Sequence, residues 1–274
     1  MEWEQLDKRI LNTYHMVRQI EEHKGIFIVE DGEGQWWFLK VVSEDSIQLS
    51  LVGKLLSTEV EGVNRIVECF TSEGYCYLIK EYIHGSNLFN FILSEGTFSE
   101  AEALSMLIDL SQSLNELHQK CGLIFKDLHP KNIMLHHGKY VLVDTETVRI
   151  VKEKQSSDTQ VIGVAGFMAP EQYGFAQSTI QSDMYSLGMV ARFALTGEIP
   201  TLTNNQIKLD EKMVGSSTRR VLDKMTAFSP GNRYRSYSES IKALRLAQEG
   251  KRSIAGKWNF LLLGVSSIVV FLLF

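Results

Sequence analysis

The chain has 274 residues, of which 44% are hydrophobic and 22% charged, and this composition excludes a disordered or collagen-like protein. With a net charge of −5, the chain lacks the excess of basic residues that neutralises nucleic-acid phosphates, so we expect no nucleic-acid partner. The three cysteines, Cys69, Cys76 and Cys121, have no CxxC spacing and are expected to be reduced residues of the core.

The N-terminal segment carries acidic residues and no apolar stretch of the kind found in secretory signals, so we expect the main body of the protein in the cytosol. Alternating residues in QWWFLKVV, residues 35–42, predict a strand that carries Lys40. Gly32 and Gly34 are expected to form the turn of the hairpin that leads into this strand. The segment after the strand predicts an amphipathic helix capped at Ser43.

Two elements in the middle of the chain enclose a polar loop. A capping box of Ser99 and Glu102 predicts the start of an amphipathic helix, which is expected to end near residues 117–118. After the loop and a Gly-Lys turn, the β-branched run YVLVD predicts a strand that ends at Asp144. The two elements should therefore hold the ends of the loop.

Three oxygen-bearing side chains lie at this loop and at the strand end. The run LIFKDLHPKNIML places Asp127 and Asn132 five positions apart across a proline, and Asp144 follows. In that geometry the Asp127 carboxylate can accept the proton of an attacking hydroxyl group. Asn132 and Asp144 supply the hard oxygen ligands that Mg²⁺ prefers when it bridges nucleotide phosphates.

This arrangement resembles the protein kinase superfamily, whose catalytic loop reads HRDLxxxN and whose metal-binding strand ends in DFG. The resemblance continues in GFMAPEQYG, SDMYSLG and SPGNRYRS, whose order and spacing match bacterial eukaryotic-like Ser/Thr protein kinases. It implies a bilobal α+β fold with a small β-rich N-lobe and a larger helical C-lobe. The implied division is an N-lobe over residues 1–83, a C-lobe over residues 84–247 and a linker over residues 248–257.

The resemblance also implies ATP and Mg²⁺ as cofactors and assigns the residues that handle them. Asp127 is the catalytic base, with Lys40 and Asn132 completing the catalytic set, and Lys40 steadies the α- and β-phosphates. Asn132 and Asp144 hold the metal. The other implied nucleotide contacts are Gly25 of the glycine-rich loop, the Glu81 carbonyl and the Ile83 amide, the last two at the adenine edge.

Structural roles are implied for the C-lobe. Glu171 should pair with Arg233, and Asp183 should accept hydrogen bonds from the backbone of the catalytic loop. Between these motifs and the catalytic loop, the hydroxyl-rich stretch 156–159 offers phosphorylation sites or is simply a flexible loop.

The N-lobe departs from the family pattern at three places. Only Gly25 remains of the three glycines expected near the phosphates. Gln48 is a rough stand-in for the helix glutamate that pairs with the strand lysine. Lys80 occupies the apolar position before the hinge, where burial of an ammonium group costs several kcal/mol unless an anion meets it; it could take over part of the role of Lys40.

The catalytic loop departs as well. Phe125 and His129 replace the histidine and the lysine of the family, and Val164 replaces a threonine. DLHPKN followed by DTE resembles the loops of aminoglycoside and choline phosphotransferases. His129 either contacts the γ-phosphate or packs beside Asp127, and Glu146 is either a further Mg²⁺ ligand or a solvated loop residue.

The C-terminal stretch 258–274, WNFLLLGVSSIVVFLLF, has no charged residue and predicts one transmembrane helix. Basic residues at 251, 252 and 257 indicate that its N-terminal side faces the cytoplasm, as in a tail-anchored protein. The leading hypothesis is a membrane-anchored kinase-like protein that transfers the γ-phosphate of ATP to Ser/Thr hydroxyls of protein substrates. The alternatives are a pseudokinase acting as a membrane-tethered binding module, and a small-molecule phosphotransferase.

Overall fold

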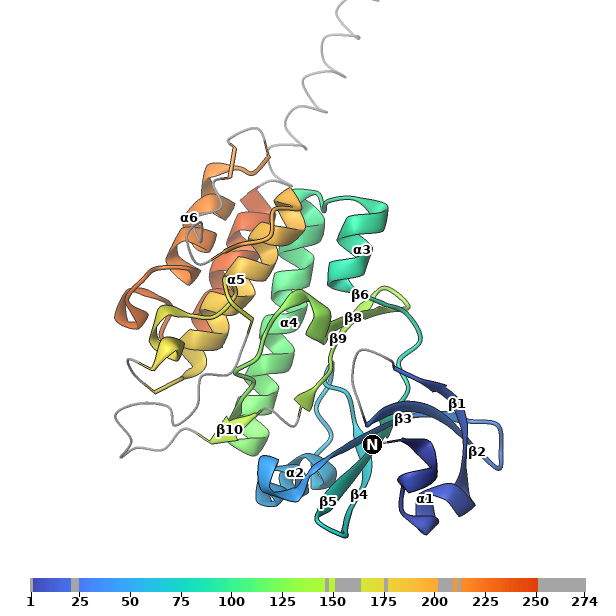
Figure 1. The fold of residues 1–274 in the computed structure, drawn as a ribbon. Helices are drawn as coiled ribbons and strands as arrows, with labels where there is room; N and C mark the ends of the chain where they lie inside the picture. Colours follow the sequence, from blue (N-terminus) through green and yellow to red (C-terminus); the bar gives the residue numbers. More distant parts are fainter. Residues whose placement is uncertain are drawn as a thin grey trace, which may run out of the picture.

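The structure is a computed structural model, and it describes residues 2–20, 25–145, 148–150, 164–174, 177–201, 209–210 and 213–250. Figure 1 shows two parts, an antiparallel sheet with short helices and a larger group of long helices. The predicted bilobal α+β fold is therefore confirmed.

The sheet of the N-lobe has five strands in the order β1-β2-β3-β5-β4, and every neighbouring pair is antiparallel. The bounds are Tyr14–Gln19 for β1, Ile26–Asp31 for β2, Trp36–Ser43 for β3, Ile66–Ser72 for β4 and Tyr75–Glu81 for β5. Lys40 lies in β3, as predicted. The predicted hairpin turn is confirmed, since Gly32 and Gly34 lie between β2 and β3 and the Gly34 N–H donates to the Asp31 carbonyl over 3.1 Å.

One face of this sheet is covered by the first residues of the chain. They form a 3₁₀ turn, Trp3–Gln5, and the helix α1, Lys8–Thr13. Asp7 caps α1 by accepting the Arg9 N–H at 2.7 Å, and it also accepts the Ser72 hydroxyl of β4 at 2.6 Å. The separate small core formed here contains Leu6, Ile10, Phe27, Val29, Leu39, Val41, Tyr77 and Ile79.

The opposite face of the sheet carries α2, Leu49–Ser57, whose Leu51, Val52 and Leu55 are buried. The predicted helix start at Ser43 is wrong. A short 3₁₀ turn, Glu44–Ser46, follows β3, and the extended backbone at Ile47 separates it from α2. The Ser43 side chain accepts no capping hydrogen bond from this turn, and the Ser43 backbone carbonyl accepts the Ser46 hydroxyl at 2.6 Å.

The C-lobe consists of helices packed around one extended core. Their bounds are Leu88–Glu95 for α3, Glu100–Cys121 for α4, Ile180–Thr196 for α5 and Ser216–Met225 for α6, followed by a helix over residues 237–250. The predicted capping box of Ser99 and Glu102 is confirmed at the start of α4. The predicted end near residues 117–118 is wrong by about one turn, because the helix continues until Gly122 ends it in a left-handed conformation, φ +67°.

Short strands of the C-lobe flank the catalytic loop. β8, Ile133–His136, pairs with β9, Lys139–Leu142, and with β6, Ser86–Asn87. β7, Leu123–Ile124, pairs with β10, Arg149–Ile150. The predicted strand ends at Leu142 rather than at Asp144, whose φ of +64° does not fit a strand. Asp144 therefore lies on a turn just beyond the strand.

No helix among the described residues is long and apolar enough to cross a membrane. The predicted transmembrane stretch 258–274 lies outside the described residues.

Candidate active site

The catalytic loop joins β7 to a 3₁₀ turn at Pro130–Asn132. Its backbone reverses sharply at Lys126, where φ is +72°, and the Asp127 N–H donates to the Phe125 carbonyl at 2.9 Å. An i to i+2 bond across a residue with positive φ is a γ-turn of the rare, strained type. Such strain is maintained only where the surrounding contacts over-determine the backbone.

Two side chains from the C-lobe provide those contacts. Asp183 of α5 accepts the Phe125 N–H at 2.7 Å and the Lys126 N–H at 2.8 Å, which confirms its predicted role. Gln172, which is fully buried, donates to the Lys126 carbonyl at 2.8 Å. Both the backbone N–H and the backbone carbonyl of Lys126 are thus hydrogen-bonded, and these bonds to Asp183 and Gln172 stabilise the turn that precedes Asp127. Sequence reasoning missed Gln172, although it directly follows Glu171.

Burial of the Asp183 carboxyl group raises its pKa to about 6, because loss of hydration outweighs the two backbone N–H donors and the Tyr237 hydroxyl. The native protein therefore keeps a proton there that the unfolded chain releases near its ordinary pKa of 3.8. The contribution of this group to the free energy of unfolding should fall as pH rises from about 4 to about 6, by on the order of 3 kcal/mol.

This pH dependence can be measured with Asp183→Asn, which cannot titrate. The difference in unfolding free energy between wild type and variant is expected to shrink as pH rises through this range, as measured by urea unfolding at pH 4 to 6.5. A difference that stays constant across the range would contradict a raised pKa. Asp45→Asn, at an exposed aspartate in the 3₁₀ turn after β3, serves as a carboxyl control.

Asp127 and Asn132 lie in direct contact. The Asn132 side-chain nitrogen donates to the Asp127 carbonyl at 3.0 Å and lies 3.5 Å from its Oδ2 atom. The nitrogen of Asn132 is thereby committed to the loop, and its amide oxygen is the atom that can meet a cation. Asp127 Oδ1 is buried without a hydrogen-bond partner among the described residues.

His129 is almost fully buried beside the catalytic loop. Its Nε2 atom lies 3.7 Å from Asp127 Oδ1, too long for a hydrogen bond but close enough for electrostatic attraction when the ring is protonated. Of the two readings of His129, this position supports packing beside Asp127.

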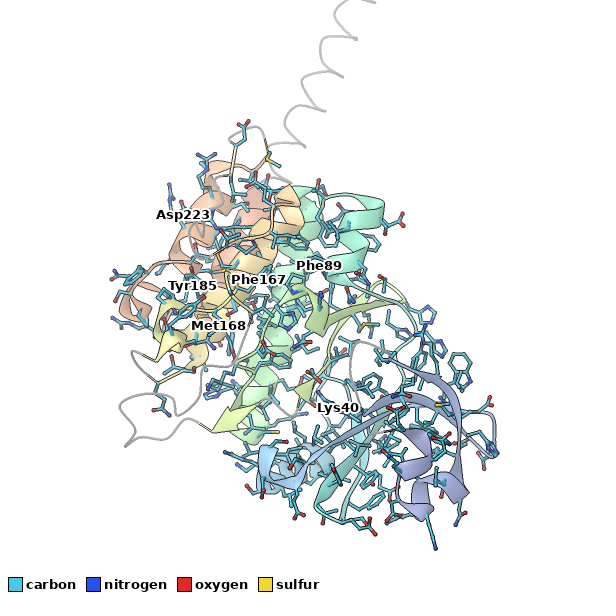
Figure 2. All side chains as sticks on the ribbon, in the orientation of Figure 1. Lys40, Phe89, Phe167, Met168, Tyr185 and Asp223 are labelled. Atoms are coloured by element: carbon cyan, nitrogen blue, oxygen red, sulfur yellow. The ribbon has the colours of Figure 1, made fainter. Side chains whose placement is uncertain are left out.

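Lys40 of the N-lobe pairs with Asp144 of the C-lobe. The Lys40 ammonium lies 2.5 Å from Asp144 Oδ1, although 104 positions separate the two residues. Figure 2 shows Lys40 on the part of the sheet that faces the helical lobe. Gln48, the proposed stand-in for a helix partner, precedes the first turn of α2. Lys40 therefore pairs with Asp144, a residue predicted to hold the metal.

Asp144 is also connected to the catalytic loop through the backbone. The Val143 N–H donates to the Asn132 backbone carbonyl at 2.9 Å, so the residue before Asp144 is bonded to the end of the catalytic loop. The structure therefore links Lys40 to Asp144 and Asn132 to Asp127, and the hydrogen bond between Val143 and Asn132 connects the two pairs. Their catalytic and metal-binding roles remain predictions.

The structure gives the surroundings of Gly25 and Glu81, two other residues predicted to contact nucleotide. Gly25 has φ +87°, and a Cβ atom there would lie 2.7 Å from the Val41 carbonyl oxygen, so close packing against β3 by itself requires glycine. Glu81 ends β5, and its N–H donates to the Arg65 carbonyl at 3.1 Å. The contacts of Gly25, the Glu81 carbonyl and the Ile83 amide with nucleotide stay predictions.

Lys80 is 1% exposed and lies opposite Phe38 in the β3–β5 register. Side chains directly opposite share a face of the sheet, so Lys80 and Phe38 lie on the same face as Lys40, two positions further along β3. The burial of Lys80 expected from the sequence is therefore confirmed, and its side chain lies on the face that carries Lys40.

A buried ion pair between Glu171 and Arg233 joins two distant segments of the C-lobe. Arg233 makes two bonds to Glu171, at 2.6 and 2.9 Å, and the arginine side chain is fully buried. Arg233 also donates to the carbonyls of Gln181, Ala227 and Phe228. The predicted pair is confirmed, and it anchors the segment that supplies Gln172.

The donor set fits ATP and Mg²⁺. The site contains the carboxylates of Asp127 and Asp144, the amide oxygen of Asn132 and the ammonium group of Lys40. Mg²⁺ typically takes one or two protein carboxylates together with substrate phosphates. Within the described ranges, no cluster of three or more histidine, cysteine or acidic side chains could hold a metal ion. Glu146 and the stretch 156–159 lie outside the described residues.

The fold and the site together are those of the kinase-like phosphotransferases. The family model described as "Protein kinase domain" matches residues 40–247, and the chain belongs to this family. Members of the family generally use ATP and Mg²⁺.

Curated relatives are bacterial. The chain is 31% identical over 192 residues to the serine/threonine-protein kinase PknA of Nostoc sp., covering 65% of this chain and 34% of the relative. It is 32% identical over 199 residues to PknB of Mycobacterium tuberculosis, covering 66% and 32%. It is 32% identical over 143 residues to the probable serine/threonine-protein kinase pknA2 of Bifidobacterium longum, covering 52% and 19%. The chain spans about a third or less of the length of these relatives.

Proposed function

We propose that the chain is an ATP- and Mg²⁺-dependent protein kinase that transfers the γ-phosphate of ATP to serine or threonine hydroxyls of protein substrates. The observation that carries the proposal is the contact of Lys40 with Asp144 between the two lobes, together with the contact of Asn132 with Asp127 within the catalytic loop. The names of the bacterial relatives support serine and threonine as acceptors.

In this proposal Asp127 orients the acceptor hydroxyl and accepts its proton. Its Oδ1 atom has no hydrogen-bond partner among the described residues, so a lone pair is available for that proton. Asn132 and Asp144 would hold the metal, and Lys40 would exchange its contact with Asp144 for the phosphates. The bound metal neutralises charge that develops on the transferring phosphoryl group.

Activity can be tested on the purified full chain with labelled ATP, Mg²⁺ or Mn²⁺ and a generic protein substrate. The expected result is label on serine or threonine residues of the substrate or of the chain itself. Label on a small-molecule alcohol and none on protein would instead indicate the phosphotransferase alternative.

A second candidate is a binding module that takes nucleotide weakly or not at all. The contact between Lys40 and Asp144 favours it, because the two charges already neutralise each other and binding must first separate them. This candidate predicts that transfer is absent in the assay above.

Thermal unfolding with Mg-ATP separates the two candidates. A ligand at about 100 times its dissociation constant adds about 2.7 kcal/mol of stability, so wild type should be stabilised if it is a kinase. Lys40→Met removes a charged contact to phosphate worth about 1.5–3 kcal/mol. The dissociation constant of this variant for Mg-ATP should therefore be about 10- to 150-fold higher than that of wild type. Lys54→Met, on α2, is a matched control expected to bind as wild type. Absence of any shift in wild type would support the binding module.

We also propose that residues 258–274 anchor the chain in a membrane with the kinase-like domain on the cytoplasmic side. The uncharged apolar sequence and its basic N-terminal flank support this. The full chain is expected to resist alkaline extraction from membranes, and a variant carrying Leu263→Arg and Val269→Arg should be released.

A further inference from the structure

Two cysteine thiols lie in contact in the hairpin formed by β4 and β5. The two strands are joined by a tight turn at Glu73 and Gly74, which both have positive φ. In the antiparallel register Thr71 lies opposite Cys76 and Cys69 lies opposite Leu78. The two cysteines are thus diagonal neighbours on one face of the sheet, and their sulfur atoms are 3.4 Å apart.

The two thiols differ in exposure. Cys76 is fully buried in the main core that packs under α2, whereas Cys69 is only partly buried at the edge of that core. The hydrogen bond with Cys76 lowers the pKa of Cys69, although burial opposes this effect. An oxidant in solution can therefore reach one thiol of the pair, and the second thiol is already within contact distance.

We propose that Cys69 and Cys76 form a reversible disulfide when the chain meets a peroxide, with Cys69 reacting first and Cys76 second. The Cys69 thiolate attacks one oxygen of hydrogen peroxide, the O–O bond breaks, and a sulfenic acid and hydroxide form; the thiol proton and the hydroxide make water. The Cys76 sulfur then attacks the Cys69 sulfur and displaces its hydroxyl group as a second water. One peroxide is reduced as two thiols are oxidised.

The two sulfur atoms already lie in contact, so the bond requires a short approach of the thiols. A disulfide bond is about 2.05 Å long, so the sulfur atoms must approach by about 1.4 Å from their 3.4 Å separation. Because diagonal neighbours of an antiparallel pair lie about 7–8 Å apart, closing the bond requires the two strands to approach each other as well as rotation of the side chains. Disulfides of this kind in reducing compartments are usually transient and redox-sensing.

Mass spectrometry of the purified full chain provides the test. Trypsin cleaves after Arg65 and Lys80, so both cysteines lie in one peptide, residues 66–80. After brief treatment with hydrogen peroxide, this peptide should be lighter by two hydrogen atoms, and a thiol reductant should restore its mass. Cys121→Ser, which removes the buried thiol at the end of α4, should behave as wild type.

Two further variants test the order of the steps. Cys76→Ser should accumulate a sulfenic acid on Cys69 that dimedone traps, and wild type should trap little. Cys69→Ser should leave Cys76 reduced at the same peroxide dose. The proposal is overturned if the wild-type peptide keeps its mass, if either cysteine pairs instead with Cys121 or with a second chain, or if Cys76→Ser fails to react with dimedone.

Discussion

Replacing Asp127 by asparagine is expected to reduce phosphate transfer by about 10²–10⁴-fold, because the substitution removes the group that accepts the hydroxyl proton. Asparagine has nearly the same shape, so the Asn132 bond to the Asp127 backbone carbonyl should persist and folding should be unchanged. The rate is measured by label transfer at saturating Mg-ATP, and folding is checked by urea unfolding.

The matched control for this variant is Asp45→Asn, at an exposed aspartate in the turn after β3. It should transfer phosphate at the wild-type rate. If Asp127→Asn and wild type label substrate equally, Asp127 is not the base and the kinase proposal loses its central residue. If neither labels substrate but both are stabilised by Mg-ATP, the chain binds nucleotide without transferring phosphate.

Replacing Arg233 by methionine is expected to lower the free energy of unfolding by about 3–5 kcal/mol. The variant leaves the Glu171 carboxylate buried without its bidentate partner, and three backbone carbonyls lose their donor. Unpaired buried charge is costly, because desolvation of the carboxylate is no longer offset by a hydrogen-bonded cation. The change is measured by urea unfolding at neutral pH.

A second ion pair in the same lobe is the control. Arg192 of α5 bonds Asp223 of α6 at 2.6 Å, but the Asp223 side chain is 59% exposed. Figure 2 shows Asp223 at the outer side of the helical lobe. The Arg192 side chain is only 9% exposed, but asparagine keeps an oxygen that can accept its hydrogen bond, so Asp223→Asn should cost about 1 kcal/mol. A cost for Arg233→Met as small as this would show that the buried pair does not hold the lobe together.

The order of motifs was sufficient to predict the fold and the residues around the site. Lys40, Asp127, Asn132 and Asp144 were identified because each occupies a fixed place in a sequence of elements. The pairing of Glu171 with Arg233 was predicted by the same means, although 62 positions separate the two residues. Motif order therefore carries information about contacts that periodicity cannot.

Other contacts could not be predicted, because they join residues without a local signal. The bond between Lys40 and Asp144 depends on the left-handed turn at Asp144, which a β-branched run does not indicate. The contact between Cys69 and Cys76 depends on strand register, which follows from the turn at residues 73–74. The helix start at Ser43 was wrong because a serine before acidic residues suits a 3₁₀ turn as well as an α-helix.

The covering of the sheet by the first residues of the chain has a spectroscopic consequence. The four tryptophans of the sequence are Trp3, Trp36, Trp37 and Trp258, so the stretch 84–247 contains none. Trp3 packs edge-on against Phe27, with ring centroids 5.6 Å apart, and Trp37 belongs to the small core beneath α1. Intrinsic indole emission on denaturation should therefore follow the loosening of the sheet and its cover, while far-ultraviolet dichroism follows mainly the melting of the helices.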